Sequence, residues 1–169
     1  PGVDHKVCEL LVDQTKIIQA EMRNLINELR PIDIDAGDLE NALHQHIQSL
    51  RRSAGAAIEF TTHGDARSLP LPIQQNLNRI AQEALSNIAR HAKASRVEVQ
   101  LQVDDGIATL SITDDGIGFD PSAATLTGTR SLGLVSMRER AELLGGALLI
   151  RSDPGKQTSI IAKIPIREE

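Results

Sequence analysis

Three stretches of the chain combine residues whose chemistry goes beyond packing, and the first is RIAQEALSNIARHA at 79–92. Glu83 and Asn87 are four residues apart, so they lie on one face of a helix. Arg90 and His91 follow one turn further along. A carboxylate, an amide oxygen and a cation in line could serve a metal-bound triphosphate and the group that attacks it. Taken alone, the pattern is more typical of an ordinary solvated helix face.

The second stretch, DDGIGF at 114–119, comes directly after an alternating apolar segment. Asp114 closes that segment, where a side chain can turn into the mouth of a cleft. Gly116 and Gly118 carry no side chains, so a ligand can approach the backbone closely there. An ordinary glycine turn has the same composition, so this stretch alone is a weak indication of a site.

The third stretch, SLGLVSMRERAELLGG at 131–146, follows a segment without periodicity at 119–132. A loop of that length inside a compact domain is usually functional, often as a lid. We expect a helix over 133–144, so Ser131 and Gly133 would leave free backbone N–H groups at its positive end, which suits a phosphate. A capped helix after a loop is the alternative. The order G-x-x-x-x-G-K-[ST] of a P-loop is missing, which disfavours a Walker-type NTPase.

Composition argues against several other functions. The 169 residues include 18 Lys and Arg against 23 Asp and Glu, a net charge of −5, and aromatic residues make up 1%. Such a chain lacks both the positive surplus and the stacking platforms of a nucleic-acid binder. No apolar run approaches the ~18–20 residues of a membrane span, and no signal peptide opens the chain. We therefore expect a soluble, cytoplasmic protein with no nucleic-acid partner.

Other reactive groups are poorly placed. Cys8 is the single cysteine, so the chain can form no internal disulfide and no multi-cysteine metal site. His44 and His46 are two residues apart on a predicted helix and face different sides, which argues against metal ligation. A G-x-S-x-G elbow is absent, so a serine hydrolase of that type is excluded.

The order of the elements predicts how the three stretches are positioned. We expect helices over 4–30, from the cap Asp38 to about Gly55, over 73–92 and over 133–144, with strands over 57–62, 96–103, 107–113, 147–152 and 158–166. The narrow apolar stripe of the first helix indicates packing against a partner helix, although a surface helix of the same domain would look alike. Hairpin-linked strands with helices on one side predict an α+β, two-layer sandwich with a mixed, mostly antiparallel sheet, preceded by a long helix.

The three stretches, taken in order, resemble the ATP-binding catalytic domain of sensor histidine kinases. This is the Bergerat fold, shared in the wider GHKL group with gyrase, mismatch-repair and chaperone ATPases. The resemblance is strongest to the group that contains the nitrate sensors and the membrane-fluidity sensor. Its marks are ELRP at 28–31, QEALSNIARHA at 82–92, DDGIGF at 114–119, LGLVSMRERAELLGG at 132–146 and DPGKQTSIIAKIP at 153–165.

The resemblance implies a role for each matching residue. Asn87 would bind Mg²⁺, Glu83 would orient or activate the group that attacks the γ-phosphate of ATP, and Asp114 would accept the adenine amino group. Arg90 would contact a phosphate, and His91 would lie in the cleft wall. Gly116 and Gly118 would line the adenine pocket. Gly133 and Leu134 would begin the phosphate-side helix with Ser131 just before them at the nucleotide, and Thr158 would lie behind the adenine aspartate. The segment 119–132 would be the lid.

The resemblance also implies an organisation and partners. Residues 1–31 would be the second helix of a dimerisation and phosphotransfer hairpin, and 32–169 the catalytic domain. The full protein would be a homodimer that transfers the γ-phosphoryl of ATP to a histidine, and then to a response-regulator receiver domain. No histidine here lies in the E-L-H-D context of the family's acceptor, and membrane attachment would come only through upstream segments.

Two departures from the family pattern keep other functions open. Ser131 stands where a glycine is common, and Gln157 replaces the second glycine of the final turn. Both could alter lid closure or nucleotide affinity. The alternatives are a regulatory or scaffold module that binds nucleotide without turnover, and a Bergerat-fold serine kinase of the anti-sigma type. The helix that ends in ELRP argues against the second.

Overall fold

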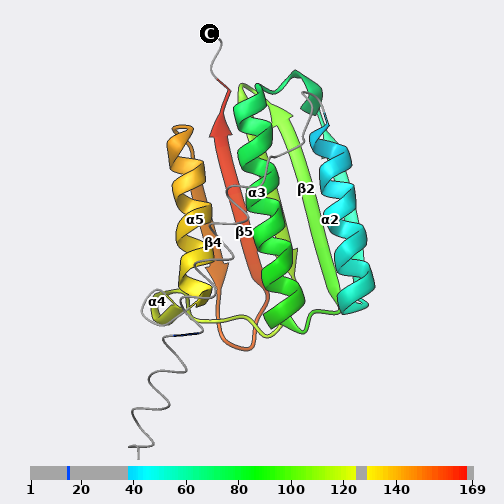
Figure 1. Ribbon diagram of the computed structural model, residues 1–169, viewed down its shortest axis with the longest axis vertical. Coiled ribbons are helices and arrows are strands. Elements are labelled where there is room, and N and C mark those ends of the chain that lie inside the picture. The colour runs from blue at the N-terminus through cyan, green and yellow to red at the C-terminus, as the bar shows by residue number, and fades with distance from the viewer. Residues whose placement is uncertain (1–14, 16–37, 125–128, 167–169) are drawn as a thin grey trace, which may run out of the picture.

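The computed structural model describes Thr15, residues 38–124 and residues 129–166 (Figure 1). The helix expected over 4–30 lies outside the described residues apart from Thr15, which is helical, and so does the break that follows it. The described elements are α2 Leu39–Ala54, β1 Ala57–His63, a 3₁₀ turn η1 Ala66–Ser68, α3 Leu71–Asn87, a π-helical turn η2 Ile88–Ala92, β2 Arg96–Asp104, β3 Ile107–Asp114, α4 Pro121–Ala124, α5 Thr129–Leu143, β4 Ala147–Ser152 and β5 Thr158–Pro165.

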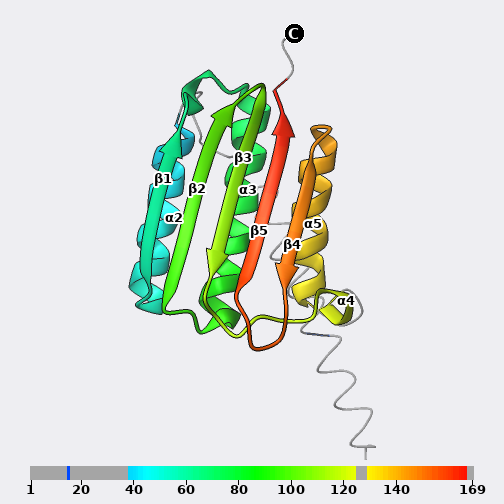
Figure 2. The ribbon, with the colours of Figure 1, turned by 180° about the vertical axis from the view of Figure 1, so that it is seen from behind.

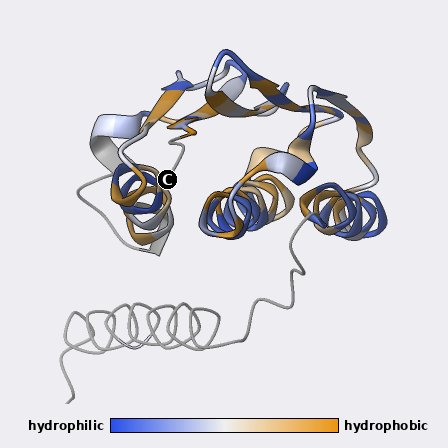
Figure 3. Ribbon diagram, turned by 90° about the horizontal axis from the view of Figure 1, so that it is seen from above, coloured by the Kyte–Doolittle hydropathy of each residue, from blue (hydrophilic) through white to orange (hydrophobic). Residues whose placement is uncertain are grey.

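The strands form one five-stranded sheet in the order β1-β2-β3-β5-β4. β1 and β2 are parallel, and the other neighbouring pairs are antiparallel. The helices α2, α3 and α5 cover one face of the sheet, and the described elements leave the other face open (Figures 2 and 3). The predicted α+β, two-layer sandwich with a mixed, mostly antiparallel sheet is therefore confirmed.

The core between the layers is aliphatic, as the near-absence of aromatic residues requires. Each strand alternates, so that one side of β2 buries Val97, Val99 and Leu101 while its other side is exposed. Leu43 on α2 and Leu77 on α3 are fully buried against this face. Burial of such side chains at about 25 cal/mol per Å² drives the two layers together.

The turns follow the expected chemistry at two places. Gly55, with φ of +65°, ends α2 in the left-handed conformation that glycine adopts without strain. Asp105 and Gly106 both have positive φ, 49° and 71°, which is the geometry of the two-residue hairpin turn between β2 and β3.

Two expectations need correction. Asp38 occupies the N-cap position of α2, but its carboxylate makes no capping bond and accepts instead from the side-chain amide of Asn41. The segment 119–132 is not all loop, because α4 lies within it and α5 begins at Thr129, four residues before the predicted start.

None of the described helices has the length and hydropathy needed to span a membrane.

Candidate functional site

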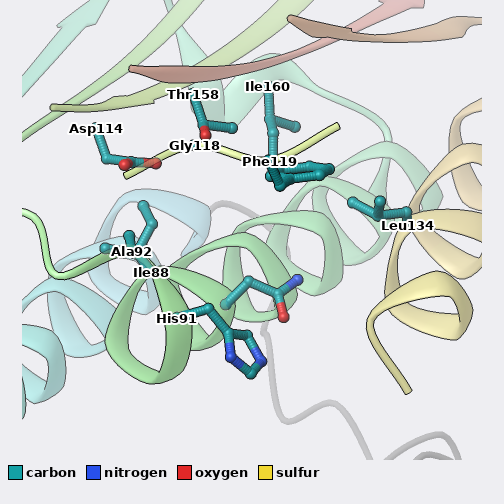
Figure 4. A pocket seen from close by; sticks show the side chains of 10 residues that line it. Ile88, His91, Ala92, Asp114, Gly118, Phe119, Leu134, Thr158 and Ile160 are labelled. Carbon is teal, nitrogen blue, oxygen red and sulfur yellow. The ribbon is translucent and has the colours of Figure 1, made fainter. Parts of the chain in front are cut away.

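A pocket opens between α3, α5 and the strands β3 and β5 (Figure 4). Most of its walls are apolar, and its polar groups come from three separate segments of the chain, the continuous helix of α3 and η2, the end of β3 and the start of β5. It is lined by Asn87, Ile88, His91, Ala92, Asp114, Gly118, Phe119, Leu134, Thr158 and Ile160. Six of the residues singled out from the sequence line this pocket, namely Asn87, His91, Asp114, Gly118, Leu134 and Thr158.

Asp114 provides the buried acid of the pocket. It ends β3 and is only 4% exposed. Its Oδ1 accepts the backbone N–H of Gly116 at 2.9 Å, and no hydrogen bond within the described part of the chain occupies Oδ2. Burial is the main cause that raises the pKa of Asp114, the Gly116 N–H works against it, and the neighbouring charge of Asp115 adds to it. The pocket thus offers one unoccupied carboxylate oxygen to a ligand's hydrogen-bond donor.

Thr158 stands beside this acid on the next strand. Asp114 and Thr158 are paired in the β3–β5 register, and Thr158 is 6% exposed. Its hydroxyl oxygen lies 2.8 Å from the hydroxyl oxygen of Ser152, which in turn accepts the backbone N–H of Phe119 at 2.9 Å. A chain of hydrogen bonds therefore runs from Thr158 through Ser152 to Phe119, the first residue of the segment 119–132. Ser152 escaped the sequence analysis, because nothing local marks a serine at a strand end as part of a site.

Two glycines allow the walls to close around the pocket. A Cβ at Gly116 would lie 2.4 Å from the carbonyl oxygen of Ala92, and a Cβ at Gly118 would lie 2.1 Å from that of Asp153. Contacts that short are not tolerated against backbone atoms, so both positions need glycine for a steric reason. Gly118 also has φ of +57°, which other residues rarely adopt.

Glu83 and Asn87 lie together on α3, as predicted. The Asn87 Nδ2 donates to Glu83 Oε1 at 3.2 Å. Because a carboxylate only accepts, this bond directs the amide NH₂ at Glu83 and leaves the Asn87 carbonyl oxygen for another partner. An amide oxygen is a ligand that Mg²⁺ accepts.

The helix widens after Asn87 into the π-turn η2. His91 lines the pocket, whereas Arg90 is exposed and does not line it. Single π-turns occur often at functional sites, where they change which residues follow one another on a helix face. The sequence pattern assumed a regular helix over 73–92 and therefore placed both residues on the face of Glu83.

α5 contributes in a different way than expected. Leu134 lines the pocket and is 6% exposed. Gly133 is the fifth residue of the helix and not its first, so the prediction of a free N–H group at a helix start is wrong for Gly133, whereas Ser131 is the third residue and stays within the first four. Its Cα faces α3 so closely that a Cβ would lie 2.1 Å from Glu83 Oε1. Ser131 belongs to α5, but its side chain is outside the described part of the structure.

The amino-acid sequence around this pocket matches a known protein family. Residues 73–168 match the family of histidine kinase-, DNA gyrase B- and HSP90-like ATPases. This match covers more than half of the chain and includes every pocket residue. The chain belongs to this family.

Individual relatives of the chain are sensor histidine kinases. The signal transduction histidine-protein kinase/phosphatase DegS of Brevibacillus brevis is 35% identical over 170 residues, covering 99% of this chain and 43% of DegS. The sensor histidine kinase LiaS of Bacillus subtilis is 37% identical over 151 residues, covering 89% of this chain and 41% of LiaS. Thus the chain spans less than half the length of these curated relatives.

Solved structures agree with the family. The mycobacterial sensor histidine kinase MprB superposes with a TM-score of 0.57 at 27% identity, covering 77% of this chain and 95% of that structure. The chain thus resembles the ATPase domain of sensor histidine kinases in sequence and in fold, and the resemblance inferred from its motifs is confirmed.

The residues present fit the nucleotide of this family. A kinase domain of this type needs an acceptor for the adenine amino group and an oxygen for the metal that accompanies the phosphates. The buried Asp114 carboxylate with its unoccupied Oδ2 suits the first, and the Asn87 carbonyl oxygen suits the second. Within the described residues there is no group of three or more His, Cys, Asp or Glu side chains that could hold a metal without the nucleotide.

Proposed function

We propose that the pocket around Asp114 binds the adenine of Mg-ATP and that the full protein uses it to phosphorylate a histidine. The observation that supports this is a buried carboxylate with one unoccupied oxygen in a largely apolar pocket. A flat heterocycle would lie between Ile88 and Ala92 on one side and Ile160 on the other, which all line the pocket. The Asp114 Oδ2 then accepts its exocyclic amino group in a charge-assisted hydrogen bond.

The phosphate side of the site would be formed by α3. Asn87 would hold Mg²⁺ through its carbonyl oxygen, and the metal, when bound, would neutralise charge on the phosphate oxygens. Glu83 would orient or activate the attacking group, and Asn87 holds that carboxylate in place through the bond of 3.2 Å. Arg90 is exposed beyond the pocket, where it would contact the phosphates from outside. His91 would form the wall between base and phosphates.

The same proposal extends to the protein from which the chain derives. A homodimer formed through an N-terminal hairpin would supply the acceptor histidine, and the phosphoryl group would pass to an aspartate of a response-regulator receiver domain. The family match and the similarity to sensor histidine kinases support this division of labour. We expect the domain to work in the cytoplasm, with any membrane anchor lying in other segments.

The experiment that tests this role is Glu83→Gln in the full-length protein, with the exposed Glu142→Gln on α5 as its matched control. We expect Glu83→Gln to bind ADP as wild type does while its autophosphorylation rate falls about a hundredfold or more, as removal of a positioned acid or base does. Autophosphorylation at the wild-type rate would refute the role of Glu83.

The product also separates the alternatives. A phosphohistidine is hydrolysed in acid, whereas a phosphoserine survives, so an acid-stable product would indicate the anti-sigma type of kinase. ADP binding by the wild-type protein without any phosphoryl transfer would instead favour the regulatory module that Ser131 and Gln157 leave open.

A further inference from the structure

The carboxylate next to the pocket acid makes more hydrogen bonds than the pocket acid itself, although it is exposed. Asp115 Oδ1 accepts the backbone N–H groups of Ser95 and Arg96, each at 2.8 Å. Asp115 Oδ2 accepts the Ser95 hydroxyl at 2.6 Å. The Asp115 N–H also donates to the carbonyl oxygen of Arg96 at 3.1 Å. These bonds, led by the one from the Ser95 side chain, hold the pKa of Asp115 below its usual range.

The bonds join two segments that form opposite parts of the pocket. Ser95 and Arg96 come shortly after the π-turn η2, separated from it by Lys93 and Ala94, and the last residue of η2, Ala92, lines the pocket. Asp115 directly follows Asp114, the buried acid. The carbonyl oxygen of Ala92 accepts the Ile117 N–H at 2.9 Å. Figure 4 shows Ala92 and Asp114 facing each other across the inner end of the pocket.

The two segments pack in direct contact around Gly116. A Cβ at Gly116 would lie 2.8 Å from the Cβ of Ala92 and 2.6 Å from Asp114 Oδ1. The backbone of Asp114 to Ile117 is therefore in direct contact with Ala92. If the segment after η2 moved outward, Ala92 would move away from a base bound in the pocket. The turn at Gly116, whose N–H donates to Asp114, would then lose its contact with Ala92.

We propose that Asp115 is a positioning residue for base recognition, which sets the separation between Ala92 and Asp114 by clamping Ser95 and Arg96 to the end of β3. The inference rests on the proposed binding of adenine at Asp114. Asp115 itself would not contact the nucleotide. It would affect the affinity for adenine nucleotides indirectly, by holding Asp114 where its carboxylate accepts the adenine amino group.

Hydrogen-bond chemistry predicts which substitutions preserve the clamp. In Asp115→Asn the amide oxygen can still accept both backbone N–H groups, and the amide NH₂ can donate to the Ser95 hydroxyl oxygen. Asp115→Ala removes all three side-chain bonds. The clamp should therefore depend on the shape of the side chain and not on its charge.

The test is calorimetric titration of this chain with ADP and with inosine diphosphate, which carries a carbonyl in place of the adenine amino group. Variants are Asp115→Ala, Asp115→Asn and, as a control, Asp104→Ala at the exposed far end of β2. A misplaced Asp114 should cost Asp115→Ala about tenfold or more in ADP affinity. Inosine diphosphate should lose less, so the preference for ADP shrinks. Asp115→Asn and the control should stay within about twofold of wild type.

The other outcomes are equally decisive. Wild-type affinity in Asp115→Ala, an equal loss for both nucleotides, or an Asp115→Asn variant as weak as Asp115→Ala would each overturn the positioning role. If thermal denaturation shows that Asp115→Ala does not fold, Ser95→Ala, which removes only the bond to Oδ2, should shift the ADP preference in the same direction by a smaller factor, and no shift would overturn the role. A wild-type chain that binds neither nucleotide would refute the proposed function itself.

Discussion

The substitution Asp114→Asn should reverse the hydrogen-bonding character of the pocket without changing its shape. The Gly116 N–H points at Oδ1 from 2.9 Å, so the asparagine must place its carbonyl oxygen there. Its NH₂ group then takes the position of Oδ2 and faces the ligand. A base that brings an amino group to this position would meet a donor where it needs an acceptor.

The magnitude follows from the two changes. Loss of a hydrogen bond to a charged group costs about 1.5–3 kcal/mol, and a buried donor left without an acceptor costs about 1–3 kcal/mol more. The sum is about 2.5–6 kcal/mol, and each 1.4 kcal/mol is about tenfold. We therefore expect ADP affinity to fall about sixtyfold or more.

The stability of the free protein should change in the opposite direction. Burial raises the pKa of Asp114 above its ordinary value of 3.8, so the folded state holds this proton more tightly than the unfolded state does. For such a group stability is highest below pH 3.8 and falls as the pH rises through the raised pKa. At neutral pH the buried charge is thus a cost, which a neutral amide avoids. Asp114→Asn should melt at the wild-type temperature or above it.

Calorimetric titration with ADP, with and without Mg²⁺, and thermal denaturation without nucleotide measure both effects on one sample. Asp104→Asn, on the exposed end of β2, is the matched control and should change neither. An Asp114→Asn variant that binds ADP within about twofold of wild type would refute the assignment of Asp114 as the base acceptor. A clear drop in melting temperature would refute the electrostatic reasoning.

Three further predictions concern the helices. Gly133→Ala should leave the free energy of unfolding within about 1 kcal/mol of wild type, because the gain in helix propensity offsets the displaced Glu83 carboxylate, yet autophosphorylation of the full protein should fall about tenfold. His46, whose pKa burial lowers from 6.5, should make the protein less stable as the pH falls below 6.5, where the unfolded state takes up the proton first, and His46→Leu should remove this slope in thermal denaturation. Leu77→Ala in the core should cost about 2–5 kcal/mol in urea unfolding, whereas Leu143→Ala, 80% exposed, should cost about 0.5 kcal/mol or less.

Each of these has an outcome that contradicts it. A Gly133→Ala protein with full activity would show that the position of Glu83 does not limit the reaction. A pH profile of His46→Leu that matches wild type would assign the acid slope to other groups. Equal costs for the two leucine variants would contradict the described core.

Much of the fold could be predicted because it depends on repeating patterns. Val97, Val99 and Leu101 alternate with polar residues, and this alone indicates a strand with one buried face. Glu83 and Asn87 were placed side by side because helical spacing is regular, and their hydrogen bond confirms it. Asp114 was found because it ends such an alternating segment.

The remainder of the site depends on contacts between distant segments, which no local pattern records. Ser152 takes part only because β4 brings its hydroxyl within 2.9 Å of the Phe119 N–H, 33 residues away. The π-turn after Asn87 has an ordinary helical sequence, IARHA, and its last carbonyl, that of Ala92, accepts from Ile117 on another loop. The early start of α5 was missed because its first residues, TRSLG, include Thr, Ser and Gly, which are weak helix formers.

The close packing around Gly118 determines where a reporter protein can be inserted into this domain. Two turns look interchangeable in the sequence, DDG at 104–106 and DPG at 153–155. The second presses the carbonyl oxygens of Asp153 and Lys156 to 2.1 and 2.3 Å from where a Gly118 Cβ would be, and Gly155 donates to Ile117 at 2.7 Å. A fluorescent protein inserted at 153–155 would disturb these contacts beside the pocket around Asp114, whereas one inserted at 104–106 would lie at the opposite end of β3 and leave the pocket intact.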